Sequence, residues 1–189
     1  MMHRRRKNRF ALNTALFVGA AAGLVWAGSI GRPVGNRRVP APTKPVDLDQ
    51  YVGRWFEFAR YDNRFERGCE GVTAEYHRLP DGLIQVVNTC RQGSPDGRSR
   101  SARGRAKIVP GSGSAKLKVS FFGPLFIGNY WVMDRAEDYS WSIVGENSGR
   151  YLWILTRAAV PDTDTQTALV RRTAELGYDT GMLRYTRHA

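Results

Sequence analysis

The feature that most constrains the fold is a Gly-x-Trp motif, Gly53 to Trp55, that opens a long series of short strand-like runs. Residues 55–61 are dense in aromatic residues with high β propensity. Gly53 gives the backbone freedom for a short helical turn over residues 47–51 to lead into this first strand. A tryptophan at the narrow end of a small barrel would bury on the order of 200 Å². We expect the guanidinium of Arg157, which ends the last strand of the series, to cover its ring.

About seven further strand-like runs follow, separated by turn signals such as Pro80-Asp-Gly82 and Asn147-Ser-Gly149. Residues 161–176 carry the one soluble helical pattern, with a proline at its start and Gly177 at its end. Residues 182–185 fit a final short strand. The sequence therefore predicts an all-β fold, an eight-stranded up-and-down antiparallel barrel with one C-terminal helix.

The hairpin around Pro80 brings the two cysteines, Cys69 and Cys90, opposite each other. We expect a disulfide, because two cysteines of an exported domain that a hairpin brings together are usually bonded. A pair of free buried thiols is the alternative. A metal site is disfavoured, since none of the three histidines has ligand spacing with the cysteines.

The chain has 189 residues and a net charge of +12, and this charge is distributed unevenly along it. Residues 1–44 hold nine basic and no acidic residues, whereas residues 45–189 hold twenty and seventeen. The folded part is nearly neutral and has no nucleic-acid motif, so nucleic acid is not an expected partner.

A basic cluster precedes an uncharged run over residues 10–30, the order of an export signal or of a membrane anchor, and both remain open. Residues 1–31 are therefore assigned to this segment, 32–45 to a linker and 46–189 to the barrel. No cysteine precedes Cys69. The expected location is the periplasm or the outer face of the cytoplasmic membrane, without lipid modification.

Three segments, GRWFEFARYDNRFERGCEGVTAEY, KVSFFGPLFIGNYWVMD and YLWILTR, together resemble the bacterial lipocalins, relatives of apolipoprotein D. The resemblance covers residues 46–185. It implies a calyx that binds a small hydrophobic ligand, with no catalytic residue, cofactor or metal to carry over.

Strand alternation assigns an inward-facing set of residues to this cup. The small residues of the set leave room for an acyl chain, and its polar residues could orient a head group. The expected ligand is a fatty acid or lysophospholipid, which the protein would bind, store or transport. The predicted ligand-binding residues are Ala59, Tyr61, Val72, Ala74, Tyr76, Ile84, Val86, Asn88, Val119 and Phe121.

An isomerase or hydrolase built on the same barrel is one alternative function, and a purely structural or scaffold role, which would require a filled barrel, is another. No nucleophile, histidine and acid arrangement supports the enzyme. Glu57 is the one residue to watch, because alternation from Trp55 points it inward. A structural ion pair with an arginine is favoured there over a general base.

An apolar loop interrupts the strand pattern, with Phe122, Leu125, Phe126 and Ile127 close together. Counting the connections places it at the end of the barrel away from Trp55. Exposed apolar clusters mark interaction sites. The loop is predicted to contact a membrane or to fold over the mouth as a lid, with plain core packing as the third reading.

Overall fold

The structure, a computed structural model, describes residues 33–189. The export or anchor segment predicted over residues 1–31 lies outside the described residues. The described chain forms nine strands, two α-helices and one 3₁₀ helix. In chain order these are α2 (Leu48–Tyr51), β1 (Gly53–Tyr61), β2 (Cys69–Arg78), β3 (Ile84–Gln92), β4 (Ser99–Ile108), β5 (Lys116–Ser120), β6 (Gly128–Arg135), β7 (Trp141–Gly145), β8 (Leu152–Thr156), α3 (Thr163–Glu175), η1 (Thr180–Met182) and β9 (Leu183–Tyr185).

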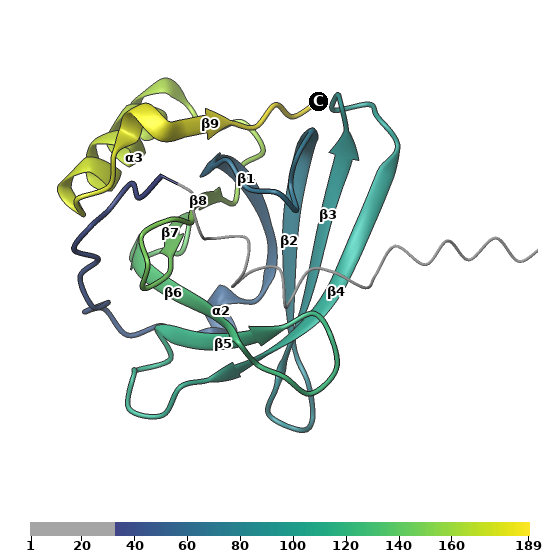
Figure 1. The fold of residues 1–189 in the computed structure, drawn as a ribbon, viewed down its shortest axis with the longest axis vertical. Helices are drawn as coiled ribbons and strands as arrows, with labels where there is room; N and C mark the ends of the chain where they lie inside the picture. The colour runs from purple at the N-terminus through teal and green to yellow at the C-terminus, as the bar shows by residue number, and fades with distance from the viewer. Residues whose placement is uncertain (1–32) are drawn as a thin grey trace, which may run out of the picture.

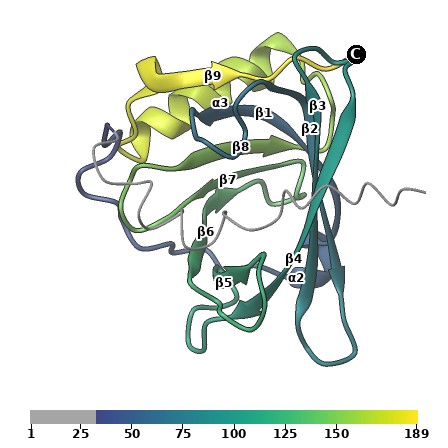
Figure 2. The ribbon, with the colours of Figure 1, turned by 45° about the vertical axis from the view of Figure 1, so that its right-hand side comes forward.

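The strands form one closed antiparallel barrel (Figures 1 and 2). Neighbours in sequence pair from β2 to β8, β8 pairs with β1, and β1 pairs back to β2. The short strand β9 extends the far half of β1, where Ala59 faces Tyr185 across the ladder. The predicted eight-stranded barrel with one C-terminal helix is confirmed. The alternating connections also collect the loops after β1, β3, β5 and β7 at the end opposite Trp55, which we call the open end.

Local chemistry sets where the helices begin. The Asp47 side chain accepts a hydrogen bond from the backbone of Asp49 and caps α2, and Asp162 does the same for α3 through Thr165. Gly53 follows α2 with a φ of +93°, a conformation that costs glycine little. Gly53 therefore lets the chain turn from α2 into β1 within two residues at the closed end of the barrel.

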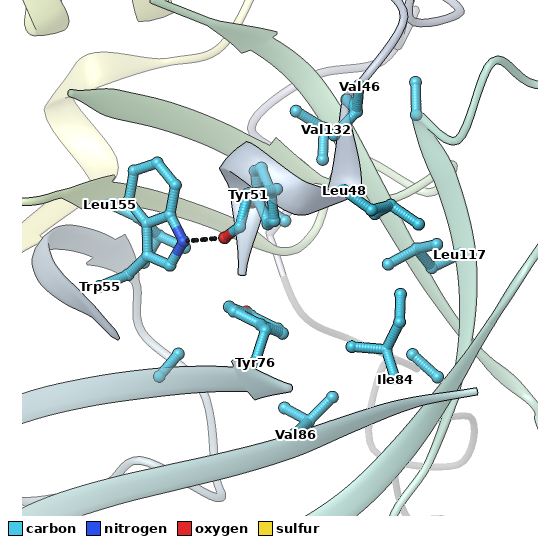
Figure 3. Packing of buried hydrophobic residues seen from close by; sticks show 14 of the residues in the cluster. Val46, Leu48, Tyr51, Trp55, Tyr76, Ile84, Val86, Leu117, Val132 and Leu155 are labelled. Carbon is cyan, nitrogen blue, oxygen red and sulfur yellow. Dashed lines mark hydrogen bonds between the residues drawn. The ribbon is translucent and has the colours of Figure 1, made fainter. Parts of the chain in front are cut away.

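Hydrophobic residues form two main cores, one inside the barrel and one outside it. The inner core includes Trp55, Tyr76, Leu117 and Leu155 (Figure 3). The outer core packs Leu169 of α3 against Phe58, Ile143 and other residues on the outer surface of β1 and β6 to β8. The helix therefore lies on the barrel wall and leaves both ends of the barrel uncovered by it.

The hairpin of β2 and β3 brings the two cysteines together. Tyr76 faces Val86, and Ala74 faces Asn88, a register two residues away from the predicted one. The shift preserves the face of every side chain, since side chains alternate with a period of two. A bulge between Glu70 and Thr73 then absorbs the mismatch near the cysteines. Cys69 and Cys90 form a disulfide with a Cα separation of 5.4 Å, which confirms the predicted bond.

Residues 33–45, which belong to the predicted linker over residues 32–45, lie against the barrel. The backbone amides of Gly35 and Asn36 both donate to Gly149 O, at 3.0 and 3.2 Å. Lys44 Nζ lies 3.0 Å from the Asp134 carboxylate, and Arg135 donates to Pro45 O. Many proline and basic residues led to the linker prediction, but composition does not reveal such long-range backbone bonds. We call this segment the strap.

Candidate ligand site

The closed end of the barrel is built around Trp55, which is fully buried. Its indole Nε1 donates to Tyr51 O at 2.8 Å, and the Arg157 guanidinium carbon lies 3.8 Å from the ring centroid. Arg157 also donates to the carbonyls of Gln50, Val52 and Arg54 at 2.7 to 3.0 Å. The C-terminal carbonyls of α2 thereby gain a cationic partner. Trp55, α2 and Arg157 together seal this end.

Three tyrosine hydroxyls form a chain inside the barrel above this seal (Figure 3 labels Tyr51 and Tyr76). Tyr130 Oη lies 2.7 Å from Tyr51 Oη and 3.0 Å from Tyr76 Oη, and Tyr51 Oη lies 3.1 Å from Ser142 Oγ. Burial raises the pKa of Tyr51 to about 12 and that of Tyr130 well above its ordinary value. The phenols stay protonated at neutral pH, so the floor of the interior is polar but uncharged.

Six of the predicted ligand residues line the interior, and one of them, Tyr76, also belongs to this floor. Four belong to the buried inner core, and the other two pack against it while partly exposed. They are Ala74, Tyr76, Ile84, Val86, Val119 and Phe121. The Phe121 ring covers Gly104 so closely that a Cβ there would meet ring carbon at 2.8 Å. The wall of β4 is therefore bare of side chain where the ring lies.

The interior opens to solvent toward the open end. Asn88 lies on the same face of β3 as Val86 and is only partly buried. Its partner on β4 is Ala102, which faces the same way and is exposed. An inward-facing alanine reached by solvent indicates an accessible mouth beside the mid-barrel residues. Asn88 is thus the predicted site residue nearest to this opening.

Three predicted ligand residues do not line the inner cup. Ala59 and Tyr61 belong to the outer core, where the Tyr61 hydroxyl donates to Asp179 O at 2.9 Å. The prediction failed because a bulge between Glu57 and Ala59 reverses the alternation of β1. Val72 forms a small separate cluster with the Cys69 and Cys90 disulfide at the β2 bulge.

A buried charged cluster lies on the interior face of β1 near the open end. Arg60 Nη1 donates to Glu57 Oε1 at 2.5 Å, and Arg60 Nε lies 3.6 Å from Glu66 Oε2. Thr186 and Asn63 donate to Glu57 and Glu66, respectively. The pairing of Glu57 with an arginine is the arrangement favoured from the sequence over a general base. One guanidinium here serves two carboxyl groups.

Burial raises the pKa of Glu66 to about 8, and the nearby charge of Glu57 adds to the effect. Burial also raises the pKa of Glu57 above its ordinary value. With both carboxyl groups disfavoured as anions, the cluster holds a proton more readily than an exposed pair would. Glu66 can therefore carry a proton at neutral pH.

Three aromatic side chains at the open end escaped the sequence analysis. Phe65, Tyr151 and Trp153 stack with ring centroids 5.9 to 6.3 Å apart, and Trp153 Nε1 donates to the Glu66 carboxylate at 3.1 Å. The Phe65 side chain, on the loop after β1, is 42 % exposed. Its position within the charged loop gave no signal, because stacking between a loop and a distant strand has no local sequence pattern. Together these rings and Glu66 hold the loop over residues 62–68 against β8.

The raised pKa of Glu66 predicts a pH-dependent stability. In the unfolded chain this carboxyl group ionises near its ordinary pKa of 4.5, whereas in the folded protein it keeps its proton up to about pH 8. Its contribution to the free energy of unfolding is therefore full below about pH 4.5 and lost as the pH rises to about 8. Glu66→Gln should flatten this decline in urea unfolding measured from pH 5 to 9. Glu75→Gln, on the outer surface, is the matched control, and equal slopes for all three proteins would contradict the assignment.

The apolar loop over residues 121–127 joins β5 and β6 at the open end. Leu125 and Ile127 are 65 % and 46 % exposed, whereas Phe122 and Phe126 are partly buried. Phe126 packs under Lys107, whose Nζ lies 5.0 Å from the ring centroid. The loop therefore turns its aliphatic side chains toward solvent.

A hollow of about 640 Å³ lies outside the barrel, between the start of α3 and the ends of β7 and β8. Trp141, Val160 and Leu169 contribute to its walls, and none of these three residues is a predicted ligand-binding residue. Within residues 33–189, no cluster of three or more His, Cys, Asp or Glu side chains could hold a metal ion. No helix in that part of the chain has the length and apolar character needed to cross a membrane.

A closed antiparallel barrel with one sealed end, one open end and a largely apolar inner wall defines a calyx-type binding protein. The chain belongs to the lipocalin family, since the family model described as a lipocalin-like domain matches residues 46–188. It is 41 % identical to the outer membrane lipoprotein Blc of Vibrio cholerae, over 78 % of this chain and 87 % of that protein. It is 36 % identical to temperature-induced lipocalin-1 of Arabidopsis thaliana, over 76 % and 80 %.

A solved structure supports the fold assignment. Insecticyanin from the tobacco hornworm Manduca sexta superposes with a TM-score of 0.66, at 20 % identity, over 84 % of this chain and 90 % of that one. Lipocalins bind small hydrophobic ligands, and the buried residues of the inner core line the barrel interior of this chain. The resemblance drawn from the sequence is thus confirmed at the level of family and fold.

The expected location needs correction. The sequence predicts an exported protein that is not a lipoprotein, but relatives from Vibrio cholerae, Escherichia coli and Citrobacter freundii are all named outer membrane lipoproteins. The prediction relied on the lack of a cysteine before Cys69. These names contradict it, because a single missing residue type is weaker evidence than 37 to 41 % identity to lipoproteins along the barrel.

Proposed function

We propose that the protein binds a single-chain lipid, a fatty acid or lysophospholipid, inside the barrel and carries or stores it at the cell envelope. The observation that carries the proposal is the interior itself. Its wall residues are small or aliphatic at Ala74, Val86, Ala106 and Val119, and its floor is the uncharged tyrosine chain. Such a cup suits an acyl chain, which needs apolar contact along its length and no charge at its end.

The names of the relatives favour an envelope setting, since several are outer membrane lipoproteins. An acyl chain gains about 0.8 kcal/mol for each methylene that it buries. Affinity should therefore rise with chain length until the chain reaches the tyrosine floor, and then level off. The head group would remain near the mouth, beside Asn88 and exposed Ala102.

Displacement of a fluorescent fatty acid by a series of saturated fatty acids and lysophosphatidylcholines tests this function on the full chain. We expect displacement to strengthen with chain length for both series, with a small difference between head groups. Mass analysis of lipid extracted from the purified protein should find single-chain lipids. Affinity that does not change with chain length would contradict the acyl-chain site.

A further inference from the structure

Basic side chains are concentrated in one part of the barrel. Residues 83–133, which include β3, β4 and β5, hold eight Lys or Arg and a single acid, Asp96. The other described residues hold fifteen basic and sixteen acidic side chains. The nearly neutral charge of the domain as a whole therefore hides a strongly positive region balanced by the rest.

Five of these residues share the outer surface of two neighbouring strands, which we call the basic wall. Cross-strand partners point to the same face, and Lys107 faces Lys118 directly. Arg103 and Arg105 face the uncharged Val87 and Gln85. The basic wall consists of Arg103, Arg105, Lys107, Lys116 and Lys118.

The basic wall carries charge without compensation. Every salt bridge in residues 33–189 involves basic residues elsewhere, such as Arg54 with Glu75 and Arg172 with Asp134. Like charges that face each other across a ladder are destabilising. A pair such as Lys107 and Lys118 with no acid nearby favours an anionic partner from outside the chain.

The exposed apolar loop lies beside this wall. Lys107 of β4 contacts the ring of Phe126, so the loop over residues 121–127 is in contact with the basic wall, and Figure 1 shows it next to β4. Leu125 and Ile127 of this loop are exposed. Cationic side chains with adjacent exposed aliphatic ones are the composition of surfaces that settle into the interface of an anionic bilayer.

We propose that the basic wall and the loop over residues 121–127 form a docking face for a lipid bilayer with anionic head groups. Leu125 and Ile127 enter the head-group region, and Arg103, Arg105 and Lys107 face the phosphates. A nucleic acid would neutralise the basic side chains but would offer no apolar surface for Leu125 and Ile127 to contact. The same loop begins at Phe121, inside the barrel, so docking brings the mouth to the lipid source. The inference rests on the proposed function only for this last step.

Sedimentation of the full chain with vesicles tests the docking face. Vesicles of phosphatidylcholine alone are compared with vesicles that also contain phosphatidylglycerol. The variant Arg103→Gln/Arg105→Gln/Lys107→Gln should weaken binding to the anionic vesicles about 100-fold at low salt. Leu125→Ser/Ile127→Ser should weaken it as well. Any binding through residues 1–31, whose basic cluster also favours anionic vesicles, is common to all the proteins, so each variant is compared with the unaltered protein on the same vesicles.

The matched control is Arg37→Gln/Arg38→Gln/Arg171→Gln, which removes the same charge from exposed positions elsewhere. It should bind anionic vesicles like the unaltered protein. Equal loss in both triple variants, unchanged binding of the Leu125 and Ile127 variant, or competition by RNA that needs no apolar loop would each overturn the proposal. Displacement of a fluorescent fatty acid is measured on every variant in detergent-free buffer. Docking that fails while this displacement persists contradicts the docking face alone.

Discussion

Replacing Val119 with arginine should abolish binding of fatty acids in a protein that remains folded. Val119 lies on the inner wall, opposite Ala106 and Gly128, and its methyl group is so close to Gly128 that a Cβ there would meet it at 2.6 Å. A guanidinium at this place would bring an unpaired charge into the apolar path of the acyl chain. We expect affinity to fall at least about 100-fold, which corresponds to about 2.8 kcal/mol.

The control is Lys118→Glu, one residue away on the outer face, where Lys118 Nζ donates to Asn129 at 2.6 Å. It should leave the affinity for fatty acids unchanged. If Val119→Arg does not fold, as judged by circular dichroism, Ala102→Trp blocks the mouth from an exposed position and should give the same loss. Undiminished affinity in either folded variant would remove the barrel interior as the site.

Replacing Arg157 with alanine should lower the free energy of unfolding by about 3 kcal/mol. The change removes the cation above Trp55 and leaves three carbonyls of α2 and β1, on Gln50, Val52 and Arg54, without their donor. Arg157→Lys keeps the charge but lacks the planar fork that reaches several carbonyls at once, so it should recover less than half of the loss.

Urea unfolding at neutral pH measures both variants, with Arg38→Ala as the control for loss of an exposed arginine. A change below about 0.5 kcal/mol for Arg157→Ala would place it among ordinary surface substitutions and contradict a structural role for the stack. Binding of fatty acids should decline little, because Arg157 belongs to the seal around Trp55 and is not one of the inner-wall residues.

Alternation and turn chemistry were sufficient to predict the strands and most of the inner wall. The hairpin of β2 and β3 illustrates why, since its register differs from the predicted one by two residues and yet every side chain keeps its face. Because side chains alternate with a period of two, a register error of two residues leaves every side chain on its predicted face. Ala74, Tyr76, Ile84 and Val86 were therefore assigned to the interior from the sequence alone.

The errors arose where an extra residue enters a strand or where distant segments meet. The bulge after Glu57 carries Ala59 and Tyr61 to the outer core, and no local residue marks it. The stack of Phe65, Tyr151 and Trp153 joins the loop after β1 to the start of β8, which is far away in the chain. The strap depends on bonds such as those to Gly149 O. Each of these features is decided by tertiary contacts that have no period.

The strap also determines the order in which its bonds would bear a force applied to the N-terminal side of the chain. Force applied at residue 33 reaches the bonds of Gly35 and Asn36 to Gly149 first, then that of Asn36 to Leu176, and only afterwards the ion pair of Lys44 with Asp134. Bonds that are loaded one after another break one at a time, and each breaks at low force. None of them belongs to the ladders that close the barrel. The bonds of the strap would therefore break before the force reached the strand ladders that hold the barrel closed.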